Sequence, residues 1–294
     1  KNTCKDILDH ITENKNLASL TWFKVGGKSN FFFQPPDEET LIKFIKNKPK
    51  NIKIFTLGSG SNVLIRDNGF KGVVIHMIKL NKIQIDEKGI ITAQSGTSDA
   101  DLSRFARNNS RTGLEFLIGI PGSIGGGIKM NSGAFGSEFK NVLIDIKAIN
   151  KNGIIKIFKV HEMKLEYRKN NLSDKWIFLS ARFKSKKGNI EEIQSKMKEI
   201  ILQRKVRQPT GVKTGGSTFM NSKSYKAWEL IHKAGCRGMK CGDAQISEKH
   251  CNFIINTDKA LAKDIETLGE NVRKKVFLSS GKKLEWEIKI VGEK

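Results

Sequence analysis

The sequence predicts an α+β fold, and three observations support this prediction. Short apolar segments bounded by Gly, Asn and Asp are typical of β-strands. Longer segments, in which apolar residues recur every three or four positions, are typical of amphipathic helices. Over residues 52–75 a strand pattern, a glycine-rich turn, a second strand pattern, another turn and a third strand pattern follow one another with no helix between them.

Five main helices and a shorter one are expected. The main helices are predicted at 37–48, 98–109, 191–206, 224–234 and 260–278. The first follows two prolines and begins with acidic residues, as the helix dipole prefers. The second opens with Ser98-Asp99-Ala100-Asp101, which is a capping-box pattern. A short amphipathic helix is expected around Ile7, Leu8 and Ile11.

The expected strands fall between these helices. They are predicted at 52–57, 63–65, 72–78, 82–86, 89–94, 142–149, 154–160, 176–184, 252–256 and 284–291. Asn152-Gly153 separates two of them and is a strong hairpin signal. In the closing strand, Glu285 and Glu287 alternate with apolar residues and so share one face.

Composition narrows the functional class. No stretch approaches the roughly 20 apolar residues of a membrane span, and the polar first residues lack the apolar core of a signal peptide, so we expect a cytoplasmic protein. The formal net charge is +23, but the lysines are spread along the chain without interleaved aromatic residues. This pattern favours anionic small ligands over nucleic acid. A basic nucleic-acid-binding protein remains the alternative from another class.

The cysteines do not form a recognisable metal motif. Cys4, Cys236, Cys241 and Cys251 make no CxxC pair. Although His232 and His250 lie near three of them, the spacings fit no common zinc motif. We therefore expect reduced thiols and no metal site.

Two glycine-rich loops are the main functional signal. One is Gly58-Ser59-Gly60-Ser61-Asn62, and the other lies within 113–136, a 24-residue stretch with eight glycines. Glycine reaches positive φ without strain, and successive N–H groups in such turns can bind anions. The pair predicts a cofactor with a pyrophosphate, and two plain tight turns are the alternative. No long helix follows the first loop, as a dinucleotide-binding Rossmann site would require.

These loops resemble those of a known family of flavoenzymes. The residues are GSGSNVLIRDNGFKGVVI (58–75), GLEFLIGIPGSIGGGIKMNSGAFGSEF (113–139), Tyr167-Arg168, GGSTF (215–219), WELIHKAGCRGMKCGDAQISEKHCNFIIN (228–256) and LEWEIKIVG (284–292). In this order they resemble the UDP-N-acetylenolpyruvoylglucosamine reductases, which are FAD-dependent enzymes of peptidoglycan precursor synthesis. The likeness runs from about Thr21 to the end of the chain.

The resemblance implies a fold and a cofactor. It implies an FAD-binding domain of the vanillyl-alcohol-oxidase/PCMH type at 21–188. The polar run 185–189 before the helix expected at 191–206 places the domain boundary there. A helical segment is then expected at 1–20 and a smaller α+β substrate-binding domain at 189–294. The resemblance implies non-covalent FAD, because no His or Cys matches a flavin-tethering position. The implied FAD-binding residues are Gly58, Ser59, Gly60, Ser61, Asn62, Gly122, Ser123, Gly126, Asn131 and Gly133.

The resemblance also implies catalytic residues. Arg168 would bind and polarise the enolpyruvyl carboxylate, Ser217 would deliver a proton to the substrate carbon, and Glu287 would complete the acid network. Tyr167 and Asn221 would contact the nucleotide-sugar substrate. Asn170, Met220 and Ser222 depart from the family pattern beside these positions.

The implied reaction is the NADPH-dependent reduction of UDP-N-acetylglucosamine enolpyruvate to UDP-N-acetylmuramate. The alternative within enzymes is an oxidase of the same cofactor fold that uses oxygen in place of NADPH. The segment beyond residue 190 favours the reductase, because the blocks at 215–219 and 284–292 are specific to that resemblance. The sequence gives no oligomeric state.

Overall fold

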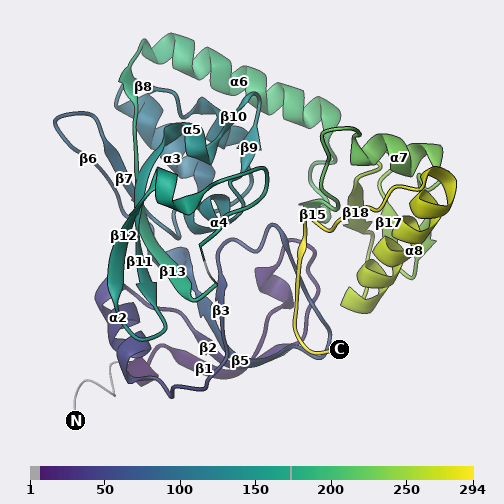
Figure 1. Ribbon diagram of the computed structural model, residues 1–294, viewed down its shortest axis with the longest axis horizontal. Coiled ribbons are helices and arrows are strands. Elements are labelled where there is room, and N and C mark those ends of the chain that lie inside the picture. Colours follow the sequence, from purple (N-terminus) through teal and green to yellow (C-terminus); the bar gives the residue numbers. More distant parts are fainter. Residues whose placement is uncertain (1–6, 173) are drawn as a thin grey trace. The chain divides into compact units, whose positions relative to one another are not determined.

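The computed structural model describes residues 7–172 and 174–294 (Figure 1). Its contacts divide the chain into two compact units. Unit 1 comprises Lys1–Glu13, Phe31–Ser59 and Gly72–Arg204, and unit 2 comprises Asn14–Asn30, Gly60–Lys71 and Lys205–Lys294. Both units are therefore discontinuous in sequence, whereas the division predicted at residues 20 and 188 uses continuous segments.

Unit 1 contains a five-stranded antiparallel sheet in the order β12-β11-β13-β7-β6. Its strands are β6 (Ile83–Ile85), β7 (Ile91–Gln94), β11 (Leu143–Asn150), β12 (Ile155–Lys159) and β13 (Trp176–Phe183). All five were predicted from sequence. A register shift between Lys147 and Ala148, opposite Leu179, inserts a bulge, so that Leu179 and Ala181, although two positions apart, belong to different cores.

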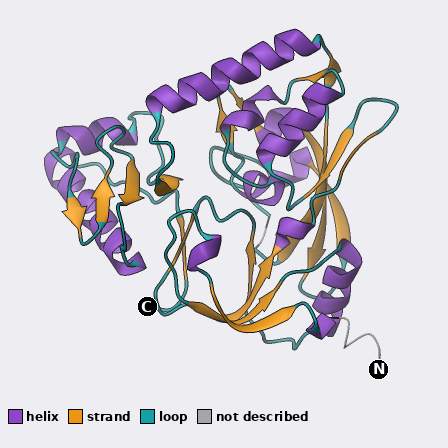
Figure 2. Ribbon diagram, turned by 180° about the vertical axis from the view of Figure 1, so that it is seen from behind, coloured by secondary structure: helices purple, strands orange, loops and turns teal. Residues whose placement is uncertain are grey.

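Helices cover both faces of this sheet in unit 1 (Figures 1 and 2). On one face, α3 (Asp99–Asn108), α4 (Ile124–Lys129) and α5 (Phe139–Val142) pack on β7, β11 and β13 around the buried Phe139. On the other, α2 (Glu38–Asn47) contributes the buried Leu41 and Phe44. The predicted N-cap of α3 is present, since the Ser98 hydroxyl accepts the Asp101 N–H at 3.0 Å.

A second sheet has the order β1-β2-β5-β3. Its strands are β1 (Ile11–Asn16), β2 (Lys28–Phe33), β3 (Ile54–Leu57) and β5 (Phe70–His76), of which β3 and β5 are parallel. The chain passes from one unit to the other within β1, β2 and β5.

The predicted N-terminal helix is wrong from Ile11 onward. Ile7 and Leu8 are helical, but Ile11 begins β1, while the first six residues of the predicted helix lie outside the described part of the chain. The polar segment Ile11–Asn16 has little strand pattern of its own, and its conformation is set by its neighbours in the sheet.

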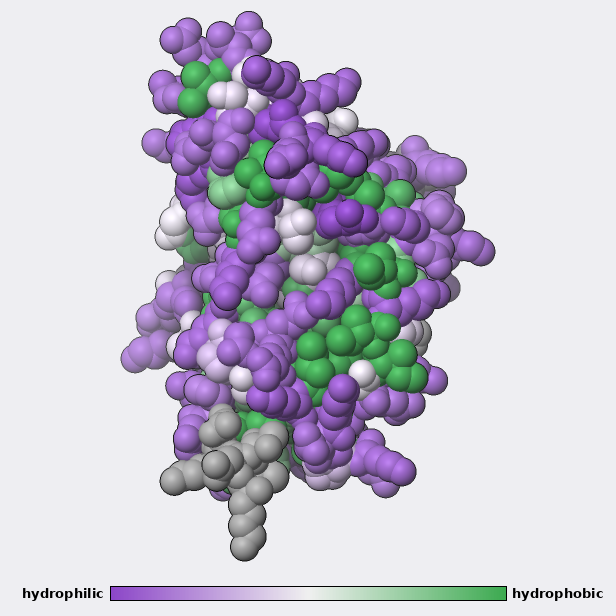
Figure 3. Space-filling model, turned by 90° about the vertical axis from the view of Figure 1, so that its left-hand side faces the viewer, coloured by the Kyte–Doolittle hydropathy of each residue, from purple (hydrophilic) through white to green (hydrophobic). Residues whose placement is uncertain are grey.

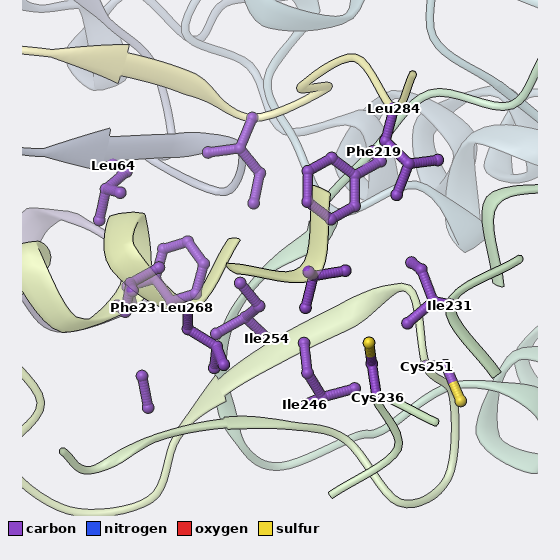
Figure 4. Packing of buried hydrophobic residues seen from close by; sticks show 14 of the residues in the cluster. Phe23, Leu64, Phe219, Ile231, Cys236, Ile246, Cys251, Ile254, Leu268 and Leu284 are labelled. Carbon is purple, nitrogen blue, oxygen red and sulfur yellow. The ribbon is translucent and has the colours of Figure 1, made fainter. Parts of the chain in front are cut away.

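Unit 2 is built on an antiparallel sheet in the order β15-β18-β17-β16. Its strands are β15 (Lys213–Ser217), β16 (Lys240–Cys241), β17 (Ala244–Ile246) and β18 (Phe253–Asn256), and its helices are α7 (Ala227–Lys233) and α8 (Ala262–Ser280). Phe23, Phe219, Ile254 and Leu268 meet in its core (Figure 4).

Unit 2 also holds a short parallel pair, β4 (Val63–Ile65) with β19 (Lys289–Val291). The expected strand at 284–291 is regular only over β19, and before it the chain makes an isolated bridge between Trp286 and Phe219. Asp67 fixes this region, because its two carboxylate oxygens accept the Ala262 and Lys263 N–H groups at 2.9 Å each. These donors lie at the start of α8, where a negative charge is favourable.

The remaining elements are short, apart from one long helix. They are η1 (Ala18–Leu20), η2 (Met77–Lys79), β8 (Arg111–Thr112), η3 (Glu115–Gly119), β9 (Gly133–Ala134), β10 (Ser137–Glu138), η4 (Val160–Met163), β14 (Lys186–Lys187) and the long α6 (Ile190–Arg207). No helix in the described residues is long and apolar enough to cross a membrane. The face shown in Figure 3 is mainly hydrophilic with smaller apolar areas.

Candidate active site

The two glycine-rich loops approach each other in unit 1. A Cβ atom added to Gly58 would lie 2.1 Å from the Ser123 hydroxyl oxygen, so glycine is needed for this approach. Ser123 is buried and bridges to Ser98. Gly126 is exposed, and a Cβ there would meet only the Ser123 hydroxyl, at 3.7 Å. The backbone at Gly126 is therefore open to a ligand, as a cofactor-binding loop requires.

The second half of the first loop belongs to unit 2. Gly60 has φ +67°, and a Cβ there would lie 2.1 Å from the Leu20 carbonyl oxygen. The Asn62 side chain donates to the Glu287 carbonyl at 3.0 Å, and the Asn62 carbonyl accepts the Lys289 N–H at 3.0 Å. Asn62 thus holds the segment that carries Glu287.

Asn131 ties the second loop to a neighbouring hairpin. It is fully buried with φ +39°. Its amide nitrogen donates to Glu138 Oε2 at 2.9 Å and to the Glu166 carbonyl at 3.0 Å, while its Oδ1 accepts the Lys140 N–H at 3.0 Å. This side chain therefore fixes backbone geometry in the loop, next to the hairpin that presents Arg168.

Arg168 lies in a strained two-residue turn. Glu166 and Lys169 exchange both backbone hydrogen bonds at 3.1 Å, which leaves Tyr167 and Arg168 at the tip, with Arg168 at φ +53°. Non-glycine residues in this region carry strain and often occur at functional sites. The guanidinium donates to the Gly133 carbonyl at 3.2 Å, and its carbon lies 4.9 Å from the Tyr167 ring centre.

Ser217 follows a bulge in β15 of unit 2. The register between β15 and β18 shifts between Thr214 and Ser217, and Gly216 within the bulge has φ +79°. A Cβ on Gly216 would meet only the Ser61 carbonyl, at 4.0 Å. Bulges re-aim side chains beside active sites, and this one sets the direction of the half-buried Ser217.

Backbone hydrogen bonds place Glu287 beside the Ser217 strand. The Glu287 N–H donates to the Thr218 carbonyl at 2.9 Å. Asn252, the residue before β18, supports this arrangement, since its carbonyl accepts the Thr218 N–H at 2.8 Å and its side chain pairs with both backbone groups of Phe219. Sequence reasoning missed Asn252 as a positioning residue; its signal was a polar side chain inside an apolar run.

Glu285 and Glu287 differ in their surroundings. Leu284 and Ile288 are buried, as the alternation predicted. Glu285 is exposed, whereas Glu287 is half-buried. The Trp286 ring is held against α8, where a Cβ on Gly269 would lie 2.0 Å from it. The half-buried position makes Glu287 the better candidate of the two for a catalytic carboxylate.

Asn221 has a structural partner. Its Oδ1 accepts the Ala227 N–H at 2.9 Å, at the start of α7. The departure Ser222 bonds to Ser224 at 3.0 Å in the same turn. The contact of Asn221 with the substrate stays a prediction.

His76 is a buried neighbour of the first loop that sequence reasoning missed. It lies opposite Leu57 in the β3–β5 pair, and its Nδ1 is 2.9 Å from Gln34 Nε2. Burial lowers the pKa of His76, although a hydrogen bond to the Gly58 backbone acts in the opposite direction and raises it. A neutral imidazole therefore supports Gly58 at neutral pH.

The cysteines of unit 2 are core residues. Cys236 and Cys251 are buried, and burial raises the pKa of both thiols. The described residues contain no group of three or more His, Cys, Asp or Glu side chains placed to hold a metal ion.

The predicted site residues are thus divided between the two units. Unit 1 holds Gly58, Ser59, Gly122, Ser123, Gly126, Asn131, Gly133, Tyr167 and Arg168, and unit 2 holds Gly60, Ser61, Asn62, Ser217, Asn221 and Glu287.

Comparison with known proteins gives the class and then the family. An FAD-binding-domain model matches residues 29–158, and a model of the C-terminal domain of UDP-N-acetylenolpyruvoylglucosamine reductase matches 208–291. Both glycine loops fall within the first region, and Ser217 and Glu287 fall in the second. These matches define an FAD-containing oxidoreductase with a PCMH-like α+β cofactor domain.

Relatives identify the family over the whole chain. A UDP-N-acetylenolpyruvoylglucosamine reductase of Rickettsia bellii (strain RML369-C) is 47% identical over 279 residues, covering 95% of this chain and 92% of the relative. The enzyme of Orientia tsutsugamushi (strain Ikeda) is 46% identical over 286 residues, covering 96% and 94%. The crystal structure of the Thermus caldophilus enzyme matches with a TM-score of 0.82 at 30% identity, covering 96% and 98%. The chain belongs to the UDP-N-acetylenolpyruvoylglucosamine reductase family.

Proposed function

We propose that this chain reduces UDP-N-acetylglucosamine enolpyruvate to UDP-N-acetylmuramate with NADPH and non-covalent FAD, in peptidoglycan precursor synthesis in the cytoplasm. The observation that carries the proposal is the hydrogen bond between Glu287 and Thr218. It joins the two segments of unit 2 that hold the proposed proton-handling residues, within the region that matches the family's C-terminal domain.

The cofactor region fits FAD in its backbone. Gly58 and Ser123 bring the two loops together, and a Cβ on Gly126 would meet only the Ser123 hydroxyl, at 3.7 Å. Both loops would hold the pyrophosphate through N–H groups. Bound FAD supplies hydride transfer, which protein side chains cannot perform. In this proposal residues 21–188 bind the cofactor and 189–294 bind the nucleotide sugar.

Each candidate residue then has a separate task. Arg168 binds the enolpyruvyl carboxylate, because a guanidinium can donate two parallel hydrogen bonds to it. Its charge stabilises negative charge that develops on the substrate. Ser217 delivers the proton to the substrate carbon, and Glu287 maintains the acid network that makes this delivery feasible. Tyr167 and Asn221 contact the nucleotide sugar.

Two half-reactions test the proposal. Under anaerobic conditions NADPH is expected to bleach the flavin absorbance, and the enolpyruvyl nucleotide is expected to restore it with formation of UDP-N-acetylmuramate. Rapid reoxidation by oxygen but not by this nucleotide would instead identify an oxidase. A colourless preparation that binds DNA with strong salt dependence would identify the nucleic-acid alternative.

The attachment of FAD is tested separately. Acid precipitation is expected to release all of the flavin into the supernatant, because no tethering residue was identified. Flavin that stays in the protein pellet would contradict non-covalent binding.

A further inference from the structure

The first residue of α3, Asp99, is an uncompensated buried acid. Its exposed fraction is 0%, and neither carboxylate oxygen has a hydrogen-bond partner among the described residues. The hydroxyl groups of Ser95, Thr97 and Ser103, from the same stretch of chain, are also buried without a partner there. A buried ionised carboxylate without a partner is strongly unfavourable, so its neutral form is preferred.

Asp99 lies directly behind the second glycine loop. Its N–H donates to the Gly122 carbonyl at 3.2 Å, and a Cβ on Gly122 would lie 2.5 Å from Asp99 Oδ2. The same segment bonds to the loop twice more, through Ile124 N–H to the Thr97 carbonyl and Gly125 N–H to the Ser95 carbonyl. Residues 95–99 therefore support the loop from behind.

The charged groups nearby are engaged elsewhere. On α3, Asp101 is exposed and pairs with Arg104 at 2.9 Å. On η3, which packs against α3, Glu115 accepts the Gly113 N–H at 2.9 Å. On β8, Arg111 donates to the Ser185 hydroxyl at 3.1 Å. Burial alone raises the pKa of Asp99 well above its ordinary value.

We propose that Asp99 is a positioning residue, held as a neutral carboxylic acid behind the second glycine loop so that this loop can bind the anionic pyrophosphate of FAD. The inference rests on the proposed function for the identity of the ligand. A charged Asp99 beside Gly122 would repel the pyrophosphate through a medium of low dielectric constant. By linkage, ionisation of Asp99 and binding of FAD oppose each other.

The protonation state is measured on FAD-free protein. The infrared difference spectrum of wild type minus Asp99→Asn at pH 7 is expected to show the C=O band of a neutral carboxylic acid. A carboxylate band in its place would overturn the proposal. If Asp99→Asn does not fold, the band is assigned in the wild type by isotopic labelling of aspartate, with Asp101→Asn as the reference.

The effect on the ligand is measured as FAD release with rising pH. Wild type is expected to lose FAD at a lower pH than Asp99→Asn, its FAD dissociation constant rising about tenfold per pH unit once Asp99 ionises. Asp101→Asn is the matched control, since it removes an exposed carboxylate from the same helix, and it is expected to behave as wild type. Equal release midpoints in all three proteins would overturn the positioning role.

The two readouts separate this inference from the proposed function. A protein that binds no FAD at pH 7 would contradict the proposed function and the positioning role together, while the infrared band would still report Asp99 by itself. A protein that binds FAD but carries an ionised Asp99 would contradict only the inference.

Discussion

Units 1 and 2 use their polar residues differently. In unit 1 the candidate residues lie in the glycine loops and the Arg168 hairpin, and the Asn131 side chain fixes backbone there with three hydrogen bonds. In unit 2 the backbone fixes the candidates, since main-chain hydrogen bonds place the Ser217 and Glu287 segments and both residues stay partly exposed. The proposed function assigns the cofactor mainly to the loops of unit 1 and the transfer of the substrate proton to unit 2. Variants can test that separation.

The largest expected effect concerns Ser217 in unit 2. Ser217→Ala is expected to slow reoxidation of the flavin by the enolpyruvyl nucleotide about 10²–10⁴-fold, the usual loss for a positioned proton donor. Reduction of the flavin by NADPH is expected to change little. Stopped-flow absorbance measures both half-reactions. If both slowed equally, Ser217 would be structural and the separation between the units would fail at this position.

The two glutamates of the closing segment give a matched pair. Glu287→Gln is expected to slow the oxidative half-reaction at least about a hundredfold, whereas Glu285→Gln changes it by a factor of only a few. The reason is that Glu287 is half-buried and bonded to the Ser217 strand, while Glu285 is exposed. Saturating substrate is needed so that weaker binding does not imitate slower chemistry. A larger loss in Glu285→Gln would move the acid site to that residue.

Glycine variants test the cofactor role of unit 1. Gly126→Val is expected to weaken FAD binding about tenfold or more while the apoprotein stays folded, because the new side chain would occupy open space that the ligand needs. Gly127→Val is the control for packing, since its Cβ would lie 2.3 Å from the Phe139 ring and should reduce folding itself. Flavin fluorescence titration and circular dichroism separate the two effects. An unfolded Gly126→Val would favour a plain turn.

Gly122 shows why the choice of glycine for such a substitution depends on the structure. From sequence, Gly122 and Gly126 are equivalent loop glycines. In the structure a Cβ on Gly122 would strike the carboxylate of Asp99, so its substitution would disturb the support of the loop rather than the ligand side. The residue that makes Gly122 necessary, Asp99, lies on α3 outside the loop, so it cannot be inferred from the loop's own pattern.

Dependence on residues distant in the chain also distinguishes the elements that could not be predicted from those that could. Local signals predicted the Ser98 cap and the five helices, since each depends on neighbours within a turn. The strand β15 was missed because Gly215 and Gly216 contradict strand propensity, and it forms by pairing with β18. The helix α4 was missed because it contains three glycines, one of which fits under Phe139.

The site followed the same division. Resemblance indicated Ser217 and Glu287, but not that the Glu287 N–H bonds to Thr218, nor that Asn252 supports the pair. Those contacts join segments distant in the chain, so their geometry becomes visible only in the folded structure.

The smallest expected effect compares two buried acids of unit 1. Asp145 is buried, as Asp99 is, but Arg182 donates to it at 2.8 Å and Lys159 at 3.0 Å from the two neighbouring strands. These hydrogen bonds, first that of Arg182, lower the pKa of Asp145 despite its burial. Ionised Asp145 therefore stabilises the folded state at pH values above the pKa of the unfolded chain, about 3.9. This stabilisation is lost as the pH falls through the pKa of the folded state.

Asp145→Asn is therefore expected to lower the free energy of unfolding at pH 7 by about 1 kcal/mol, a modest figure because both cationic partners are partly exposed to solvent. The difference from wild type should shrink as the pH falls below about 4. Asp99→Asn should instead raise the free energy of unfolding at pH 7 relative to wild type. The raised pKa of Asp99 makes wild type lose stability as the pH rises above the pKa of aspartate in the unfolded chain. Urea unfolding across pH 3–8 measures the free energy of unfolding of both variants. The affinity of Asp145→Asn for FAD should stay within about twofold of wild type, because Asp145 supports the sheet and not the loops. A difference for Asp145→Asn that grew toward acid pH would show that the Arg182 pair does not stabilise the folded state.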